Sequence, residues 1–417
     1  MHQHAPSVAE DAAASLNPDG DPKPVTWVQT RLTNGTAAGR FHSHSYYDIP
    51  VFDAESRRVV LYRTSVAGRH PSGDDTIEIG VIDVMDPARR WTPIGESRAW
   101  SVQQGPMAQW VGGDESGGSQ VIWNDREDGR IVARVHDLAT GRTRTLPRAV
   151  YAVDPDGRHM LSLNLLRLNT LRPGYGYSGD MDDTDSRLDR KPDDDGVWRV
   201  DLETGDAALI LSLKRAVRFL MRQLGLRSRL GHLRRRYIYW FNHAKLSPDG
   251  TRFTVKLRFR VPGGPWNEAM GYSLTCGVDG RDLRLLAPAT SHVIWYDGDR
   301  LYFWQQGKVR LFRDAGPGTQ EAVFAPSVLD ANVHIRQIPG LPDRFVFDTP
   351  YREEIDVCIL DLKTGQAERI AQFGNHTPAK GPFRCDLHPV PSPDGQHILV
   401  TTLEDGGRQV HLLSRSD

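Results

Sequence analysis

The chain has 417 residues, of which 39% are hydrophobic and 25% charged, so it can bury a sizeable core. Its 52 Lys and Arg residues balance 53 Asp and Glu residues, which argues against nucleic-acid binding. Runs of about eighteen apolar residues are absent, so no transmembrane segment is predicted. Three cysteines cannot build a disulfide framework.

The first 24 residues are rich in Ala, Asp and Pro and lack the apolar stretch of a signal peptide. We expect residues 1–24 to form a disordered tail, residues 25–417 to form the folded domain, and the protein to be cytoplasmic.

An internal repeat dominates the folded part. A Pro-Asp-Gly phrase precedes a strand-forming run three times. The phrase predicts a tight turn, because Pro presets φ and Gly accepts positive φ. These turns are Asp154–Gly157, Ser247–Gly250 and Ser392–Gly395. Weaker copies with the same rhythm raise the number to seven: Val51–Arg63, Gln109–Asp125, Tyr296–Trp304 and Ile338–Thr349.

A second strand follows each copy, as in Val132–Gly141, Val197–Gly205 and Val357–Gly365. Most copies start roughly 40 to 60 residues apart, which is enough for the four strands of a propeller blade. We therefore predict an all-β protein, a seven-bladed β-propeller in which Val25–Leu32 completes the last blade. Two stacked β-sandwiches are the alternative.

One longer gap, about residues 168–236, is predicted to be an insertion with an acidic loop and a basic helix. Asp180–Asp195 holds eight aspartates, typical of a solvated loop and less typical of a calcium site. Leu211–Arg236 has helical spacing of apolar residues and nine basic residues. Such a helix packs on the propeller, binds an acidic polymer or lies on a membrane.

Three groups of polar residues are candidates for chemistry, because propellers carry function on loops at the channel mouth. The first is Arg40–Asp48, which includes His42, His44, Tyr46 and Tyr47. Histidine and tyrosine side chains can exchange protons with a substrate, although an aromatic blade start can also serve packing alone.

The second group places Tyr151 before a turn and Arg167 after the following strand. An arginine can stabilise a nearby phenolate or neutralise a substrate carboxylate, and a structural cation–π pair is the alternative. Tyr175 and Tyr177 follow on a Gly-rich loop that suits sugar stacking or a rigid turn.

The third group is a set of late His and Cys residues, namely His243, His292, His334, Cys385 and His388. Cys385 and His388 have a spacing that can bind zinc if neighbouring blades supply two more ligands. The alternative is separate hydrogen-bonded histidines and a buried thiol.

The chain resembles β-propeller polysaccharide lyases, especially the ulvan lyases, and more distantly the oligogalacturonate lyases. The resemblance runs from about His42 to the C-terminus and rests on the order of several phrases. They are HSHSYYDIPVFD, QQGPMAQW, YAVDPDG with NLLR and RPGYGY, FNHAKLSPDGTRF, SHVIW and RCDLHPVPSPDG.

The resemblance implies β-elimination on a uronic-acid-containing oligosaccharide or polysaccharide. It implies that Arg167 neutralises the carboxylate and Tyr151 transfers the proton, with His44, or else His70, as the histidine partner. It also implies one structural zinc ion bound by His292, His334, Cys385 and His388. We expect the substrate to be bound by His42, Tyr47, Gln109, Tyr175, Tyr177 and His243.

Two other functions remain open. One is a non-catalytic propeller that binds carbohydrate or protein. The other is a glycoside hydrolase, which needs two carboxylates across the channel, with Asp48 and Asp125 as candidates.

Overall fold

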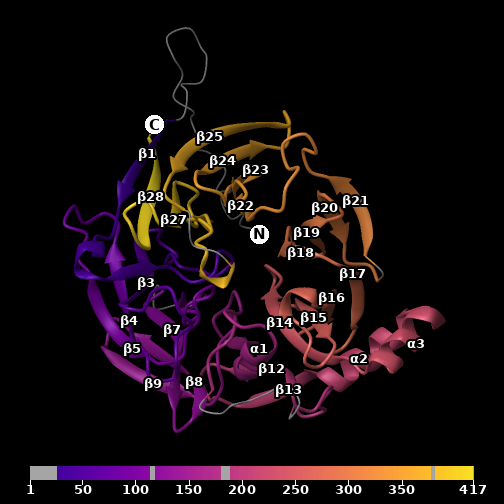
Figure 1. Ribbon diagram of the computed structural model, residues 1–417. Coiled ribbons are helices and arrows are strands. Elements are labelled where there is room, and N and C mark those ends of the chain that lie inside the picture. Colours follow the sequence, from indigo (N-terminus) through magenta and orange to yellow (C-terminus); the bar gives the residue numbers. More distant parts are fainter. Residues whose placement is uncertain (1–25, 113–117, 180–187, 317, 377–380, 417) are drawn as a thin grey trace, which may run out of the picture.

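The computed structural model describes residues 26–112, 118–179, 188–316, 318–376 and 381–416. These residues form seven four-stranded antiparallel sheets, arranged as blades around a common axis (Figure 1). The predicted all-β seven-bladed propeller is confirmed.

The strands follow one another from the axis outwards in the first six blades. Blade 1 has β2 (Phe41–Ser43), β3 (Arg58–Thr64), β4 (Ile77–Asp83) and β5 (Thr92–Ser97); blade 2 has β6 (Gln109–Trp110), β7 (Gln120–Glu127), β8 (Arg130–Asp137) and β9 (Arg142–Leu146); blade 3 has β10 (Ala152–Val153), β11 (His159–Ser162), β12 (Gly196–Asp201) and β13 (Ala207–Ser212). Blade 4 has β14 (Ile238–Leu246), β15 (Arg252–Arg260), β16 (Met270–Gly277) and β17 (Arg284–Pro288); blade 5 has β18 (Ser291–Trp295), β19 (Arg300–Gln305), β20 (Lys308–Arg313) and β21 (Thr319–Val323); blade 6 has β22 (Ile335–Ile338), β23 (Leu341–Asp348), β24 (Ile355–Asp361) and β25 (Gln366–Phe373).

The last blade closes the ring with both ends of the chain. It consists of β26 (Val390–Pro391), β27 (His397–Thr402), β28 (Gln409–Ser416) and β1 (Thr26–Arg31). The register of β1 against β28 runs from Thr26 opposite Ser416 to Arg31 opposite His411. The predicted N-terminal closing strand is therefore confirmed, and it gives the last blade four strands like the others, with β1 as the outer edge.

Each Pro-Asp-Gly phrase forms the tight turn between the first and second strands of its blade. The glycine N–H groups of Gly157, Gly250 and Gly395 donate back across the turn. All three glycines have φ near +68°, a conformation that costs glycine little. Apolar side chains from the strands form the core, in which Trp123, Trp240 and Phe345 are among the fully buried residues.

The described helices are α1 (Leu165–Leu171), α2 (Leu213–Gln223) and α3 (Leu226–Arg235), with short 3-10 turns η1 (Thr36–Ala38), η3 (Trp266–Glu268) and η4 (Gly381–Phe383). None of these helices is long and apolar enough to cross a bilayer.

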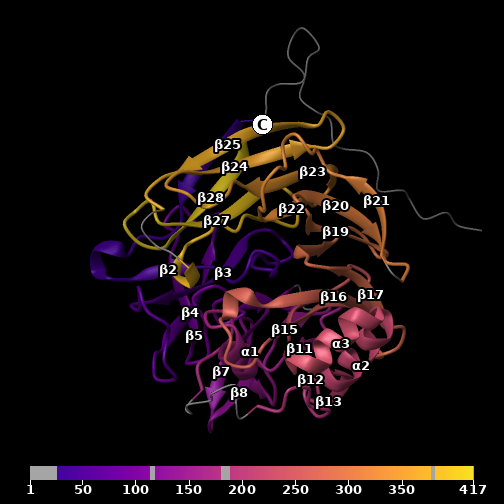
Figure 2. The same ribbon diagram turned by 45° about the vertical axis from the view of Figure 1, so that its right-hand side comes forward.

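The gap at 168–236 is not one insertion, because β12 and β13 of blade 3 divide it. Helix α1 lies between β11 and β12, whereas α2 and α3 connect blades 3 and 4 at the outer rim of the ring (Figure 2). The predicted single basic helix breaks at Leu224 and Gly225, which separate α2 from α3. The predicted tail and part of the acidic loop, residues 180–187, fall outside the described residues.

Candidate functional site

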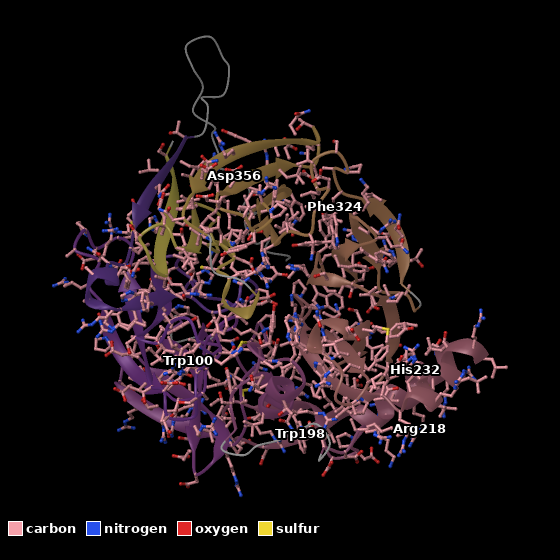
Figure 3. The ribbon with its side chains drawn as sticks, viewed as in Figure 1. Trp100, Trp198, Arg218, His232, Phe324 and Asp356 are labelled. Atoms are coloured by element: carbon pink, nitrogen blue, oxygen red, sulfur yellow. The ribbon has the colours of Figure 1, made fainter. Side chains whose placement is uncertain are left out.

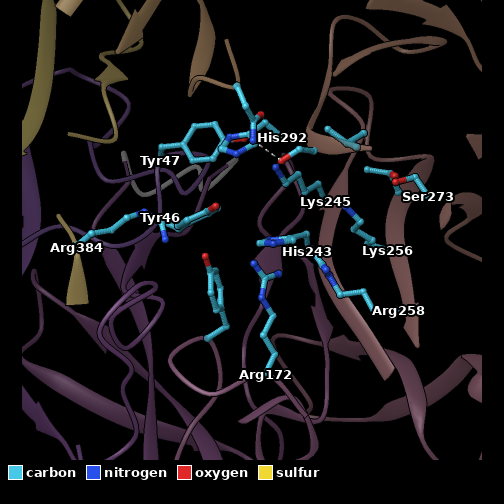
Figure 4. A pocket seen from close by; sticks show the side chains of 15 residues that line it. Tyr46, Tyr47, Arg172, His243, Lys245, Lys256, Arg258, Ser273, His292 and Arg384 are labelled. Atoms are coloured by element: carbon cyan, nitrogen blue, oxygen red, sulfur yellow. Dashed lines mark hydrogen bonds between the residues drawn. The ribbon is translucent and has the colours of Figure 1, made fainter. Parts of the chain in front are cut away.

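A polar pocket lies at one end of the central channel, away from the Pro-Asp-Gly turns. The turn prolines Pro155, Pro248 and Pro393 line a mainly apolar opening at the other end. Side chains from several blades converge on the polar pocket (Figure 4). Its lining residues are Tyr46, Tyr47, Arg172, Tyr175, His243, Lys245, Thr254, Lys256, Arg258, Ser273, Ser291, His292, Val293, Asn332 and Arg384.

Local backbone distortions position three of the histidines at this end of the channel. His243, His292 and His388 have φ values of 54°, 52° and 51°, although none is a glycine. The ladder slips between Asn242 and Lys245 on β14, and again between Ser291 and Ile294 on β18. Bulges of this kind re-aim side chains and concentrate at functional sites.

Strand β15 supplies positive charge to the pocket through its period-two pattern. Phe253, Val255 and Leu257 are buried in the core on one face. The opposite face places Lys256 and Arg258 in the pocket wall. Lys256 Nζ donates to the Thr290 carbonyl, and burial together with Arg258 holds the pKa of Lys256 well below its ordinary value, so a bound anion would favour its charged form.

Arg172 brings a third cation from the loop after α1. Its guanidinium lies over the Tyr175 ring, 3.7 Å from the ring centroid. Among the described residues, no carboxylate forms an ion pair with Arg172, Lys256 or Arg258.

Two other lining cations are already neutralised. Lys245 pairs with Asp48 at 2.7 Å, and Arg384 pairs with Asp386 at 2.8 Å. The pocket therefore has an excess of positive groups, which favours an anionic ligand.

A hydrogen-bond network joins Tyr151 to His243. The Tyr151 hydroxyl accepts from Gln104 Nε2 at 2.9 Å and from the His243 backbone N–H at 3.1 Å. It lies 3.3 Å from Asn242 Oδ1 and 3.4 Å from His243 Nδ1. The His243 ring stacks on Tyr46, at 5.5 Å between centroids. These contacts fix the imidazole at the pocket wall.

Burial and the neighbouring cations set the protonation states of these groups. Burial, together with Arg172 and Lys245, holds the pKa of His243 well below its ordinary value, so the neutral imidazole predominates at neutral pH. Burial raises the pKa values of Tyr46 and Tyr151, which keeps both hydroxyls protonated. Burial and the adjacent Arg172 lower the pKa of Arg258.

A second cluster of donors lies behind the pocket. One ligand atom each from His334, Asp386 and His388 lies within 4.8 Å of the others, and all three residues are buried. The His292 ring approaches His334 to 4.3 Å between centroids. His292 Nδ1 and His388 Nε2 are buried without a hydrogen-bond partner.

The donor set fits a divalent metal ion. Imidazole and carboxylate are common ligands of zinc and other divalent transition metals. Asp348 Oδ2 lies 2.9 Å from His334 Nδ1 and would orient that ring, as outer carboxylates do at metal sites. The orphaned nitrogens of His292 and His388 would gain a partner.

Cys385 does not belong to this cluster, contrary to the predicted ligand set. Its thiol points to the Thr401 carbonyl at 3.5 Å, and burial raises its pKa to about 11. Since consecutive side chains point in different directions, the neighbouring Asp386 takes the place that we predicted for Cys385.

Arg167 does not meet Tyr151, so their predicted pairing is corrected. The Arg167 guanidinium donates to the Tyr239 carbonyl at 2.7 Å and to the Asp189 carbonyl at 2.7 Å. It thereby ties α1 to β14. The arginine that lines the pocket nearby is Arg172, which belongs to the RPGYGY phrase.

The other predicted residues divide between the pocket and the scaffold. Tyr47, Tyr175 and His243 line the pocket, as do the predicted metal ligand His292 and Tyr46 of the first candidate group. The remaining predicted residues do not line it: His44, His70, His42, Gln109 and Tyr177.

Scaffold contacts account for these five residues. His44 Nδ1 lies 2.5 Å from the Ser45 carbonyl, and His42 bonds Gln409. His70 packs on Phe383, 4.8 Å between centroids. Gln109 lines the opposite, apolar opening, and the Tyr177 hydroxyl accepts from Asn124.

Sequence reasoning missed Lys256, Arg258 and Asp386. The alternation of Lys256, Arg258 and Arg260 with apolar residues along this strand was the available signal, because charged residues are rarely buried without a partner.

Comparisons with known proteins show the fold. An oligogalacturonate lyase in complex with manganese is similar with a TM-score of 0.61 and 16% identity, covering 94% of this chain and 97% of that one. An oligogalacturonate lyase from Vibrio parahaemolyticus has a TM-score of 0.54 and 13% identity, covering 94% and 97%. The β-propeller domain of the Trilobed protease from Pyrococcus furiosus has a TM-score of 0.47 and 12% identity, covering 87% and 92%.

No protein-family model and no curated protein sequence matches the chain. The chain is thus a β-propeller similar in fold to oligogalacturonate lyases. At these identities the likeness extends to the fold alone.

Proposed function

We propose that the protein is a lyase that cleaves a uronic-acid-containing oligosaccharide or polysaccharide by β-elimination in the polar pocket. The observation that carries the proposal is the convergence of unpaired cations on a neutral histidine and protonated tyrosines. The fold likeness to oligogalacturonate lyases supports the same reaction class.

The cations would make the substrate reactive. The proton at C5 of a uronate becomes more acidic when the adjacent carboxylate is neutralised. The negative charge that develops as this proton leaves is then stabilised by the positive group. Arg172 and Arg258 are suited to this role, since a guanidinium can hold a carboxylate through two hydrogen bonds.

His243 would take the C5 proton. In the tautomer whose Nδ1 proton faces the Tyr151 hydroxyl, Nε2 has the lone pair that a base requires. The C4–O4 bond then breaks as the C4–C5 double bond forms. Tyr46, protonated and in the pocket wall, would protonate O4 and afterwards recover a proton from His243.

Tyr151 would act by holding His243, because its hydroxyl is buried in the network and is not among the lining residues. Its direct participation in proton transfer stays a prediction.

His292, His334, Asp386 and His388 would hold a divalent metal ion, with zinc the ion that the sequence resemblance implies. A cation there would add positive potential beside the substrate carboxylate. Tyr46 contacts His388, 4.8 Å between centroids, so the metal ligands also support the proposed proton donor.

The pocket does not favour a glycoside hydrolase. No carboxylate is among the described residues that line it. Asp48 is paired with Lys245, and Asp125 pairs with Arg134 at 3.1 Å. A non-catalytic carbohydrate-binding propeller remains the second outcome of the test.

The test is an ultraviolet assay of the unsaturated product with a panel of uronate-containing glycans. We expect an increase in absorbance with at least one glycan. The variant His243→Gln should reduce kcat by about 10²- to 10⁴-fold, since a general base contributes that much. Tyr151→Phe should have a smaller effect.

His136→Gln is a matched control, because this histidine lies on β8, away from the pocket. Full activity in His243→Gln would overturn the proposed base. Glycan binding without any product would instead identify a binding propeller.

A further inference from the structure

The two helices between blades 3 and 4 differ in how they use their apolar residues. Helix α2 buries Leu213, Ala216, Val217 and Leu220. Helix α3 has no buried residue. Both project from the outer rim, where Arg218 and His232 are labelled in Figure 3.

Three leucines of α3 form an exposed stripe. Leu226, Leu230 and Leu233 are 74%, 50% and 69% exposed, and their spacing of four and three places them on one helix face. They are three of the nine large apolar side chains that are exposed among the described residues. Removing such side chains from water is favourable, so the stripe is suited to contact a binding partner.

The stripe points away from the propeller. His232, on a different face of α3, lies 2.8 Å from the Tyr239 hydroxyl and packs on Phe259, 4.7 Å between centroids. Since neighbouring helix positions differ by about 100°, the leucines cannot share this contact. α3 is therefore held by His232 while its apolar face stays uncovered.

Basic residues border the stripe on both sides. Arg227 and Arg234 follow Leu226 and Leu233 directly, and Arg229 lies on the other side. Residues 213–236 contain nine Lys and Arg residues and neither Asp nor Glu. Arg229 also donates to the Arg222 carbonyl at 2.8 Å, which fixes the turn between the helices.

A second exposed apolar segment adjoins this helix. Met270 begins β16 directly opposite Phe259, whose ring contacts His232. Met270, Trp266 and Val261, all within the β15–β16 hairpin, are 40% exposed or more. Exposed Trp, Leu and Arg side chains are typical of surfaces that bind at a lipid interface.

We propose that α3 docks on the surface of an anionic phospholipid membrane, with its leucines in the acyl–headgroup boundary and its arginines on the headgroups. An acidic polysaccharide would use the arginines but gain nothing from the leucines. A second copy of the chain would place one basic face against another.

The test is co-sedimentation of the full chain with vesicles. Binding is expected to vesicles that contain phosphatidylglycerol in phosphatidylcholine, and not to phosphatidylcholine alone. The triple variant Leu226→Ser, Leu230→Ser and Leu233→Ser should weaken binding about tenfold or more. Replacing Arg227 and Arg234 by Gln should weaken it about fivefold per charge.

Matched controls come from other exposed apolar residues. Replacing Val28, Met85 and Leu341 by Ser removes the same kind of surface elsewhere and should leave binding unchanged. Both triple variants should keep the thermal transition of the propeller, since the replaced side chains are exposed.

Three results would overturn the proposal. One is the absence of binding to anionic vesicles at low salt. Another is vesicle binding that survives the leucine replacements, which would indicate a purely electrostatic surface of the kind an acidic polymer uses. The third is a leucine-dependent dimer in light scattering, which would identify a second copy as the partner.

Discussion

The polar pocket and helix α3 are both basic, but their surroundings differ. In the pocket, Lys256 and Arg258 stand on a strand inside a blade and face a confined space. On α3, Arg227 and Arg234 lie in solvent beside exposed leucines. Confined cations lack full hydration and attract an anion strongly and selectively, whereas exposed cations are screened by salt and act together as a surface.

The largest expected effect comes from comparing Arg258, which would bind the substrate, with Arg252, which stabilises the fold through an ion pair. Arg258→Met should lower kcat/KM about 100-fold yet leave the protein equally or more stable, because it removes a buried cation next to Arg172. Arg252→Met is the contrast, since Arg252 bonds Asp314 at 2.7 Å. That variant should lose about 3 kcal/mol of unfolding free energy and retain activity once folded.

Urea unfolding and single-substrate kinetics on the two variants check this comparison. A stability loss in Arg258→Met as large as that in Arg252→Met would show that the pocket arginine is structural.

The proposed metal ligands are tested by comparing variants of Asp386 and of its neighbour Cys385. Asp386→Asn should reduce bound divalent metal and lower metal affinity about 10- to 100-fold or more, since it removes a ligand charge. Cys385→Ser should retain the metal, because that thiol points to Thr401. Elemental analysis of protein purified without a metal-affinity column decides between the two; equal metal loss in both variants would restore Cys385 as a ligand.

The pH profile tests the state of His243 directly. Its pKa is lowered from about 6.5, so it releases its proton at a lower pH and remains a base in mildly acidic solution. The acid limb of kcat/KM should therefore lie below pH 6.5, and activity at pH 5.5 should exceed by several-fold that expected for an unperturbed histidine. An acid limb at or above pH 6.5 would assign the base to another group.

Sequence patterns predicted the scaffold better than the site. The Pro-Asp-Gly turns and the closing strand depend on local chemistry, which is readable along the chain. Tyr47, Tyr175 and His243, which we predicted from loops and blade starts, line the pocket, and their role in substrate binding stays a prediction. The predicted pairing of Arg167 with Tyr151 was wrong, because Arg167 instead contacts Tyr239 and this contact depends on how α1 packs.

The arrangement of the site depends on backbone details that residue types do not indicate. His243 and His388 were predicted as site residues, but nothing in their residue type indicates their positive φ. Asp386 and Cys385 differ by one position, so a small change of backbone direction decides which one meets His334. Sites assembled from several blades depend on such details.

The smallest expected effect is the response of the two basic regions to salt. Raising the NaCl concentration about tenfold, from low to near-physiological and above, should weaken vesicle binding through α3 at least fivefold, because its arginines are exposed. The KM for an anionic glycan should rise only about two- to threefold, since Lys256 and Arg258 act at short range inside the pocket. If both quantities changed by the same factor, the pocket cations would be as well solvated as those on α3, and the distinction between confined and surface charge would fail.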